Sequence, residues 1–238
     1  MPCLPRRGSS ENRGLVPTAA CSSPSRRRGA MIHPPDLRHM DADVRIGYPA
    51  SRKIPSRRLT IGPGAFLRSG TTIYEGSWIG DHLETGHHVV IREENIIGHD
   101  VSIWNNTTID YGCKIRNRVR IHCNVYVAQF TILEDDVFLA PGVTIANDPH
   151  PGCAFSRKCM QGPRLERGVQ VGVNVTIAPF VTIGAGTLVG AGAVVTRDLP
   201  PGVFACGNPA RPVKTLDSLT CSTGWTQIPY PDGKIVAD

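Results

Sequence analysis

This 238-residue chain lacks most of the patterns that identify a common fold. It has no run of 18 apolar residues, so no transmembrane span is expected. Its N-terminus has no apolar stretch of the kind that a secretory signal peptide requires. Its eight cysteines are scattered and show no disulfide framework, which favours a reducing cytoplasm as the compartment. Neither the period of an amphipathic helix nor that of a half-buried strand dominates the sequence.

The net charge of +6 belongs almost entirely to the N-terminus. Residues 1–30 are rich in Arg, Ser, Pro and Gly and hold six Arg and one Glu, so they are expected to be disordered. The remainder is nearly neutral, and no binding to nucleic acid is expected. A transit peptide is one reading of this segment, but a true start at Met31 or Met40 is preferred.

What the chain does have is an aliphatic residue at nearly every sixth position between residues 59 and 198. The positions are Ile61, Leu67, Ile73, Ile79, Ile91, Ile97, Ile103, Ile109, Ile115, Ile121, Val127, Leu133, Leu139, Ile145, Leu165, Val171, Ile177, Ile183, Val189 and Val195. Only Thr85 breaks the series. A period of six is typical of a solenoid in which one short strand turns one corner every six residues.

The residues around this series fit the same geometry. Small or β-branched residues stand two positions earlier, as at Thr71, Ser77, Val101, Thr107, Val119, Val143, Val175 and Val181. Turn-forming residues stand one position later or near it, as at Gly62, Gly80, Gly98, Asn105, Asn117, Asp135, Gly172, Gly184 and Gly190. The chain is therefore predicted to be all-β, a parallel β-helix of about seven triangular coils.

The repeat also predicts the domain boundaries. Residues 1–58 form a disordered tail and lead-in, 59–198 form the β-helix, and 199–238 form a C-terminal segment and tail. The hexad frame breaks once, at 149–162, after coil five. An insertion confined to one place in a regular array is usually functional.

The chain resembles the hexapeptide-repeat acyltransferases over about residues 59–213. The resemblance is strongest in Ile183-Gly184-Ala185-Gly186, in Val189-Gly190-Ala191-Gly192-Ala193-Val194-Val195 and in Gly207-Asn208-Pro209-Ala210-Arg211. It implies a left-handed β-helix, a homotrimer with sites between subunits, and acetyl-CoA as co-substrate. The stretch from Gly86 to Asn95, with Asn124-Val125-Tyr126, resembles the nucleotide-sugar N-acetyltransferase branch, which makes acetamido sugars for surface polysaccharide.

Residues 18 apart stack on one edge of such a helix. One edge therefore gathers three columns of polar and aromatic residues, namely His88, Asn106 and Asn124; Gly86, Trp104 and His122; and His87, Asn105 and Cys123. Asn and His tolerate the positive φ of tight corners, which is one explanation. The other is a polar wall that binds a small-molecule sugar acceptor.

Acyl transfer needs a nucleophile with a free lone pair and a place for its proton, and a histidine of near-neutral pKa is a natural base. His122 and His150 are the candidate bases, although an amine that arrives unprotonated needs none. The resemblance puts Asn124 near the acceptor and the thioester. The further candidates for acceptor binding are His88, Arg92, Glu94, Asn106, Asn147 and Asp148.

Small residues on coils six and seven are the candidates for the groove that holds the pantetheine arm. They are Ala178, Gly184, Ala185, Ala191 and Gly192, and the candidates for binding the phosphates of CoA are Arg197, Arg211 and Lys214. Ordinary corner geometry and solvated surface charge explain the same residues equally well.

Other classes of protein stay open. Acetyl transfer to a sugar hydroxyl is the first alternative, and a non-catalytic scaffold of hexapeptide coils is another. A γ-class carbonic anhydrase needs a third histidine two coils before His82 and His87, and His39 precedes the predicted helix. No metal is expected, although His150, Cys153, Cys159 and Cys221 are ligand types that suit a structural zinc ion.

Overall fold

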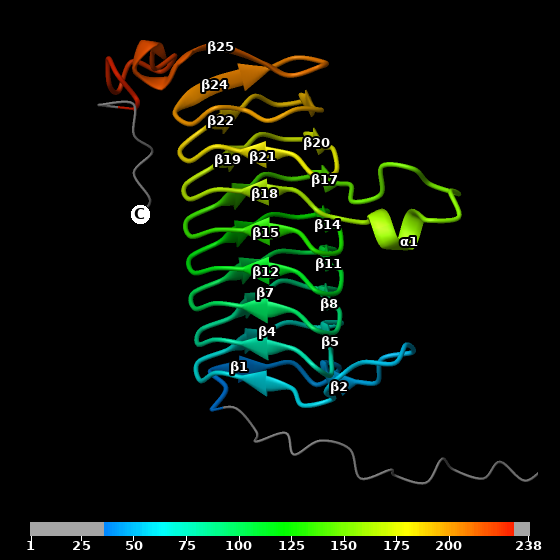
Figure 1. Ribbon diagram of the computed structural model, residues 1–238. Helices are drawn as coiled ribbons and strands as arrows, with labels where there is room; N and C mark the ends of the chain where they lie inside the picture. The colour runs from blue at the N-terminus through cyan, green and yellow to red at the C-terminus, as the bar shows by residue number, and fades with distance from the viewer. Residues whose placement is uncertain (1–35, 231–238) are drawn as a thin grey trace, which may run out of the picture.

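The computed structural model describes residues 36–230, and in them the chain coils into a three-sided prism with one sheet on each side (Figure 1). Sheet A contains β1 (His39–Met40), β4 (Phe66–Leu67), β7 (Glu84–Thr85), β10 (Ser102–Ile103), β13 (Arg120–Ile121), β16 (Phe138–Leu139), β19 (Gln170–Val171), β22 (Leu188–Val189), β24 (Val203–Cys206) and β25 (Arg211–Thr215). Sheet B contains β2 (Arg45–Tyr48), β5 (Thr72–Tyr74), β8 (Val90–Ile91), β11 (Thr108–Ile109), β14 (Tyr126–Val127), β17 (Thr144–Ile145), β20 (Thr176–Ile177) and β23 (Val194–Val195). Sheet C contains β3 (Thr60–Ile61), β6 (Trp78–Ile79), β9 (Ile96–Ile97), β12 (Lys114–Ile115), β15 (Ile132–Leu133), β18 (Arg164–Leu165) and β21 (Thr182–Ile183).

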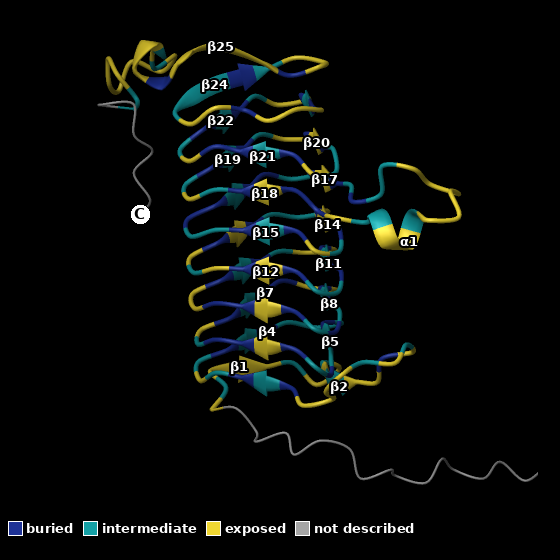
Figure 2. Cartoon of the chain, in the orientation of Figure 1, coloured by how far each residue is buried: buried dark blue, intermediate teal, exposed yellow. Residues whose placement is uncertain are grey.

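This architecture confirms the predicted left-handed parallel β-helix. The second residue of each short strand in the repeat is the hexad residue, and its side chain points to the axis. Ile73, Leu139 and Val189 are each 0% exposed, and the interior of the stack is continuously buried (Figure 2). Since one coil cannot cover its own interior, the free energy of folding comes largely from the contacts between neighbouring coils.

The corners of the prism have a second period of six. Every sixth residue from Gly64 to Gly142, and again from Gly168 to Gly192, has a positive φ. Glycine occupies many of these positions because it adopts this conformation without steric cost. The others are mostly Asn, Asp and His, the types that tolerate it best among residues with a side chain.

The stack of strands begins ahead of the predicted boundary at residue 59. Strand β1 pairs in parallel with β4, with His39 opposite Phe66, and β2 pairs with β5. His39 therefore belongs to the first coil, although the hexad period leaves it outside the helix. The period could not reveal this because the loop at 49–59 interrupts the frame. The predicted disordered tail at 1–30 and the alternative start at Met31 lie outside the described residues.

The C-terminal end of the stack is closed by a hairpin. Strand β24 continues sheet A in parallel beside β22, and β25 returns antiparallel to β24. The 3₁₀ helix Leu216–Ser218 follows and buries Leu216. Among residues 36–230, no helix is long and apolar enough to cross a membrane.

The insertion leaves the helix at the corner between sheets B and C and carries α1 (Ser156–Cys159). Its neck is closed where the amide of Gln161 donates to the carbonyl of Asn147 at 2.8 Å. The loop between β2 and β3 leaves from the same corner at the other end of the stack (Figure 1). Both departures from the repeat thus lie on one edge of the prism.

Candidate functional site

The corner between sheets A and B, here the A–B corner, carries the predicted columns. Trp104 and His122 occupy equivalent positions on consecutive coils, and their rings meet edge-on, with centroids 3.7 Å apart and an interplanar angle of 66°. On its other side His122 contacts Phe138 of β16, at 5.5 Å between centroids. The imidazole therefore sits among aromatic rings instead of standing free in water.

This environment changes the titration of His122. Burial lowers the pKa of the imidazole below its ordinary value, and the neighbouring Arg120 lowers it further. Both effects disfavour the charged form. His122 is therefore neutral at pH 7, which is the state that a general base requires.

His88, Asn106 and Asn124 form the column of positive φ at this corner, at 57°, 58° and 59°. Their backbones continue the stack, since Asn124 donates its amide to the carbonyl of Asn105 at 2.9 Å. The turn thus explains why Asn recurs in the column. All three side chains are exposed, and that of Asn124 lies two residues from His122 on the same corner.

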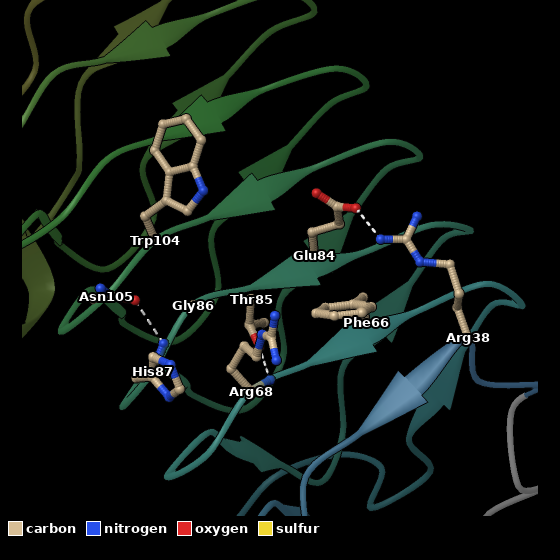
Figure 3. Close-up of a pocket in the computed structure, with 9 residues that line it drawn as sticks. All are labelled: Arg38, Phe66, Arg68, Glu84, Thr85, Gly86, His87, Trp104 and Asn105. Atoms are coloured by element: carbon tan, nitrogen blue, oxygen red, sulfur yellow. Dashed lines mark hydrogen bonds and ion pairs between the residues drawn. The ribbon is translucent and has the colours of Figure 1, made fainter.

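A hollow of about 380 Å³ opens below Trp104 on this corner (Figure 3). It is lined by Arg38, Phe66, Arg68, Glu84, Thr85, Gly86, His87, Trp104 and Asn105. Thr85, the one polar residue in the axial series, is 4% exposed, and its hydroxyl lies 3.0 Å from that of Thr71. It also accepts a hydrogen bond from the amide of Arg68 at 3.1 Å. The break in the hexad series is therefore part of this hollow.

The corner between sheets B and C, here the B–C corner, holds a second polar cluster. Asp110, 6% exposed, accepts hydrogen bonds from Arg92 at 3.2 Å, from the hydroxyl of Tyr126 at 2.8 Å and from Gln129. Gln129 in turn accepts a hydrogen bond from Asn147 at 2.5 Å, at the neck of the insertion. Burial raises the pKa of Tyr126 to about 12, with its bond to Asp110 adding to the effect.

The loop at 49–59 covers the other end of this cluster. Arg52 pairs with Glu93 at 2.6 Å and also with Glu94, and its guanidinium lies 4.0 Å from the centroid of Tyr111. Burial by itself would raise the pKa of Glu93, but its hydrogen bonds with Arg92 and Arg52 outweigh this and hold it below its usual value. The cluster is therefore a charged structural network, in which two of the predicted acceptor residues, Arg92 and Glu94, already have partners.

The insertion places the remaining predicted residues on the B–C corner as well. Asp148 accepts the backbone amide of His150 at 2.9 Å and a hydrogen bond from the hydroxyl of Ser156, which hold the start of the loop in a bend. The hydrogen bond from Ser156 is the main cause of the lowered pKa of Asp148. His150 is exposed. Within one protomer, His150 and His122 therefore lie on different corners, with sheet B between them.

The predicted CoA residues are spread over all three corners. Ala178 follows β20 at the B–C corner, Gly184 and Ala185 follow β21, and Ala191 and Gly192 follow β22. A Cβ on Gly184 would lie 2.4 Å from the backbone nitrogen of Pro201, so the returning chain explains this glycine. A Cβ on Gly192 would meet nothing within 4 Å. The predicted phosphate-binding residues Arg197, Arg211 and Lys214 are all exposed.

The structure, where it describes the chain, contains no group of three or more His, Cys, Asp or Glu side chains that could hold a metal ion. The alternative zinc site at His150, Cys153, Cys159 and Cys221 is thus not assembled. The three cysteines of that set are free thiols.

Sequence reasoning missed Asp110, Gln129 and Arg52. The hexad register alone could have found the first two, because Arg92 and Asp110 are 18 residues apart and so are Gln129 and Asn147. Arg52 lies outside the regular array, and no periodic signal pointed to it.

Comparison with known proteins identifies the family to which this β-helix belongs. Residues 162–197 match the family described as bacterial transferase hexapeptide (six repeats). The chain is 31% identical to a galactoside O-acetyltransferase from Escherichia coli over 164 residues, which cover 65% of this chain and 81% of that protein. This protein belongs to the hexapeptide-repeat acyltransferases.

The chain has two further similarities, one in sequence and one in fold. The chain is 30% identical over 228 residues to the bifunctional protein GlmU from Rubrobacter xylanophilus, covering 83% of this chain but only 44% of GlmU, so it spans about half of that relative's length. A solved structure of a putative acetyltransferase from Bacillus cereus shares the fold, with a TM-score of 0.53 and 23% identity over 74% of this chain and 86% of that one.

Proposed function

We propose that this protein transfers an acetyl group from acetyl-CoA to an amino group of a nucleotide-linked sugar in the cytoplasm, as a step in surface polysaccharide synthesis. The observation that carries the proposal is the A–B corner. There a neutral His122 and the exposed amide of Asn124 lie two residues apart, directly above an open hollow.

The chemistry assigned to this corner is a balanced acyl transfer. The amino nitrogen of the sugar attacks the thioester carbonyl, and a C–N bond forms while the C–S bond breaks. His122 accepts the proton that the nitrogen loses and passes it to the departing sulfur, so that CoA leaves as the free thiol and His122 returns to its neutral form. The side-chain amide of Asn124 donates a hydrogen bond to the carbonyl oxygen while that oxygen carries negative charge.

The active form in this proposal is a homotrimer. His150 and His122 lie on different corners of one protomer, so the inserted loop can approach the A–B corner only of a neighbouring copy. Light scattering at micromolar concentration tests the assembly, and a monomer that is fully active would contradict a shared site.

Acetyl-CoA is expected to lie along coils six and seven, with its pantetheine arm beside Ala191 and Gly192, which continue the columns of Cys123 and Asn124 along the A–B corner. Neighbouring coils are about 4.8 Å apart. Three coils separate Asn124 from Gly192, so the thioester end of an extended arm has about 14 Å to span. Ala178, Gly184, Ala185, Arg197, Arg211 and Lys214 remain proposed CoA contacts. No metal takes part.

The test is a screen of nucleotide-linked amino sugars with acetyl-CoA, in which free thiol is measured with the parent protein and with His122→Gln. The expected product is an amide, which resists hydroxylamine. Acetyl transfer to a hydroxyl is the second candidate, because the matched galactoside O-acetyltransferase acts on oxygen according to its name. An acetyl group that hydroxylamine releases would favour that candidate.

A further inference from the structure

The hollow on the A–B corner has a simple origin in the repeat. Arg68, Gly86 and Trp104 are each 18 residues apart and occupy equivalent positions on successive coils (Figure 3). Gly86 stands between the arginine below and the indole above and adds no side chain; an added Cβ would lie 2.2 Å from the side-chain oxygen of Asn105, so the close approach of Asn105 requires glycine here. Two coil spacings separate Arg68 from Trp104, which is about 9.5 Å. That leaves room for one planar ring against the indole and a group beneath it.

The walls of the hollow carry excess positive charge. Arg38 is paired with Glu84 at 2.6 Å, so these two charges offset each other. Arg68 has no carboxylate partner within 4.0 Å among residues 36–230, and its guanidinium lies 4.5 Å from the centroid of Phe66. The guanidinium of Arg38 lies over the same ring at 4.7 Å. Phe66 thus holds two guanidinium groups at the mouth, one of them free to bind an anion.

The interior of the hollow offers polar and aromatic contacts together. Trp104 lies at the upper end of the hollow with an indole that is partly buried and extends away from Arg68 (Figure 3), and His87 is exposed at the rim. An aromatic face stacks well on a nucleobase, and a guanidinium fork matches a phosphate. This combination suits a ligand that has a heteroaromatic ring at one end and phosphates next to it.

We propose that this hollow binds the nucleoside diphosphate of the ligand, with the base stacked on Trp104 and a phosphate bound by Arg68. The assignment rests on the proposed function, and it names the part of the acceptor that the A–B corner recognises. Trp104 contacts His122 directly at 3.7 Å between centroids. Arg68 lies three coils, about 14 Å, below His122, so a sugar attached to the diphosphate must fold back toward Trp104 to reach the reacting corner.

The same chemistry occurs in CoA, which carries its own adenosine diphosphate, and the hollow could recognise that moiety instead. The position of the hollow favours the acceptor as its ligand. The hollow lies on the coils of β4, β7 and β10, whereas the sequence that resembles a CoA site lies on the coils of β19 to β23. Separate titrations with UDP and with adenosine 3′,5′-diphosphate distinguish the two sources.

The experiment is isothermal titration of the full-length protein, without acetyl-CoA, against UDP, dTDP, uridine, ribose 5-phosphate and adenosine 3′,5′-diphosphate. UDP or dTDP is expected to bind, and Arg68→Gln and Trp104→Leu are each expected to weaken that binding about tenfold or more. Trp104→Phe should keep most of the affinity that Trp104→Leu loses. Arg116→Gln and Trp78→Leu are the matched controls, because both residues are exposed and lie away from sheet A. Uridine should lose affinity only with Trp104→Leu, and ribose 5-phosphate only with Arg68→Gln.

Three results would overturn the assignment. The first is that neither UDP nor dTDP binds, and the second is that their affinity is unchanged in both Arg68→Gln and Trp104→Leu. The third is that Arg68→Gln weakens the binding of adenosine 3′,5′-diphosphate more than it weakens the binding of UDP. The binding assay uses no turnover, so its outcome is separate from that of the proposed function. UDP binding that depends on Arg68 and Trp104, with no acetyl transfer to any sugar, would reject the proposed reaction and leave the site in place.

Discussion

The indole of Trp104 lies against the imidazole of His122, 3.7 Å between ring centroids, and so joins the upper end of the hollow to the candidate base. The two residues are 18 apart in the sequence and therefore occupy equivalent positions on consecutive coils. The repeat brings them together, while their side chains decide the chemistry. The contact buries part of the imidazole, and burial is the main reason that the pKa of His122 is lowered.

Replacing Arg120 with Gln should raise the pKa of His122, because the neighbouring positive charge that disfavours the imidazolium is removed. A base works only when it is deprotonated, so the acidic limb of kcat/KM should move to higher pH. The pH profile of turnover and the NMR titration of the imidazole measure this shift, with Arg116→Gln as the control. An imidazole pKa that rises while the limb stays fixed would exclude His122 as the base.

Replacing Asn124 with Ala should lower kcat/KM by roughly 10²-fold if its amide stabilises the oxyanion, with the affinity for CoA unchanged. Asn106→Ala is the matched control for stability only, because Asn106 has the same backbone conformation one coil earlier, with φ of 58° against 59°, but is itself a candidate for acceptor binding. Both variants should lose similar stability, because Ala tolerates positive φ less well than Asn. An Asn124→Ala variant that keeps the full activity of the parent protein would move the reacting centre off this corner.

Removing the insertion should abolish turnover and leave the coils folded. Deletion of 148–161 has the length of the predicted loop, joins Asn147 directly to Gly162 and restores the hexad frame. It keeps Gly162, where an added Cβ would lie 2.5 Å from the backbone nitrogen of Thr131. Circular dichroism and thermal unfolding report the fold, and thiol release reports activity. A fully active deletion variant would show that the loop has no part in the reaction.

Replacing Thr85 with Val makes the hexad series perfect, yet it should destabilise the protein. The hydroxyl of Thr85 is buried against that of Thr71 and accepts the amide of Arg68 at 3.1 Å. Valine would leave that amide without its acceptor, a loss of about 1–3 kcal/mol in the free energy of unfolding. Denaturant unfolding measures the change, and an increase in stability would mean that the interior prefers an aliphatic residue here, as elsewhere in the series.

The sequence by itself determined the coil. A hexad residue such as Ile73 or Val189 has to be buried, and with one strand per six residues the only surface that can bury it is the next coil. The same period fixed which side chains stack, so the columns of Trp104 and His122, and of Asn106 and Asn124, followed from residue numbers alone.

Only the tertiary structure decided what those columns do. The pairing of β1 with β4 depends on contacts across an irregular loop, which leave no periodic trace, and it brings Arg38 to the mouth of the hollow. Likewise, Arg52 reaches Glu93 from outside the array. The hollow itself lies between the large side chains of Arg68 and Trp104, where Asn105 packs so closely on Gly86 that a Cβ would not fit. A one-dimensional pattern fixes the spacing of backbones, but the shape and charge of a site come from side chains that meet in three dimensions.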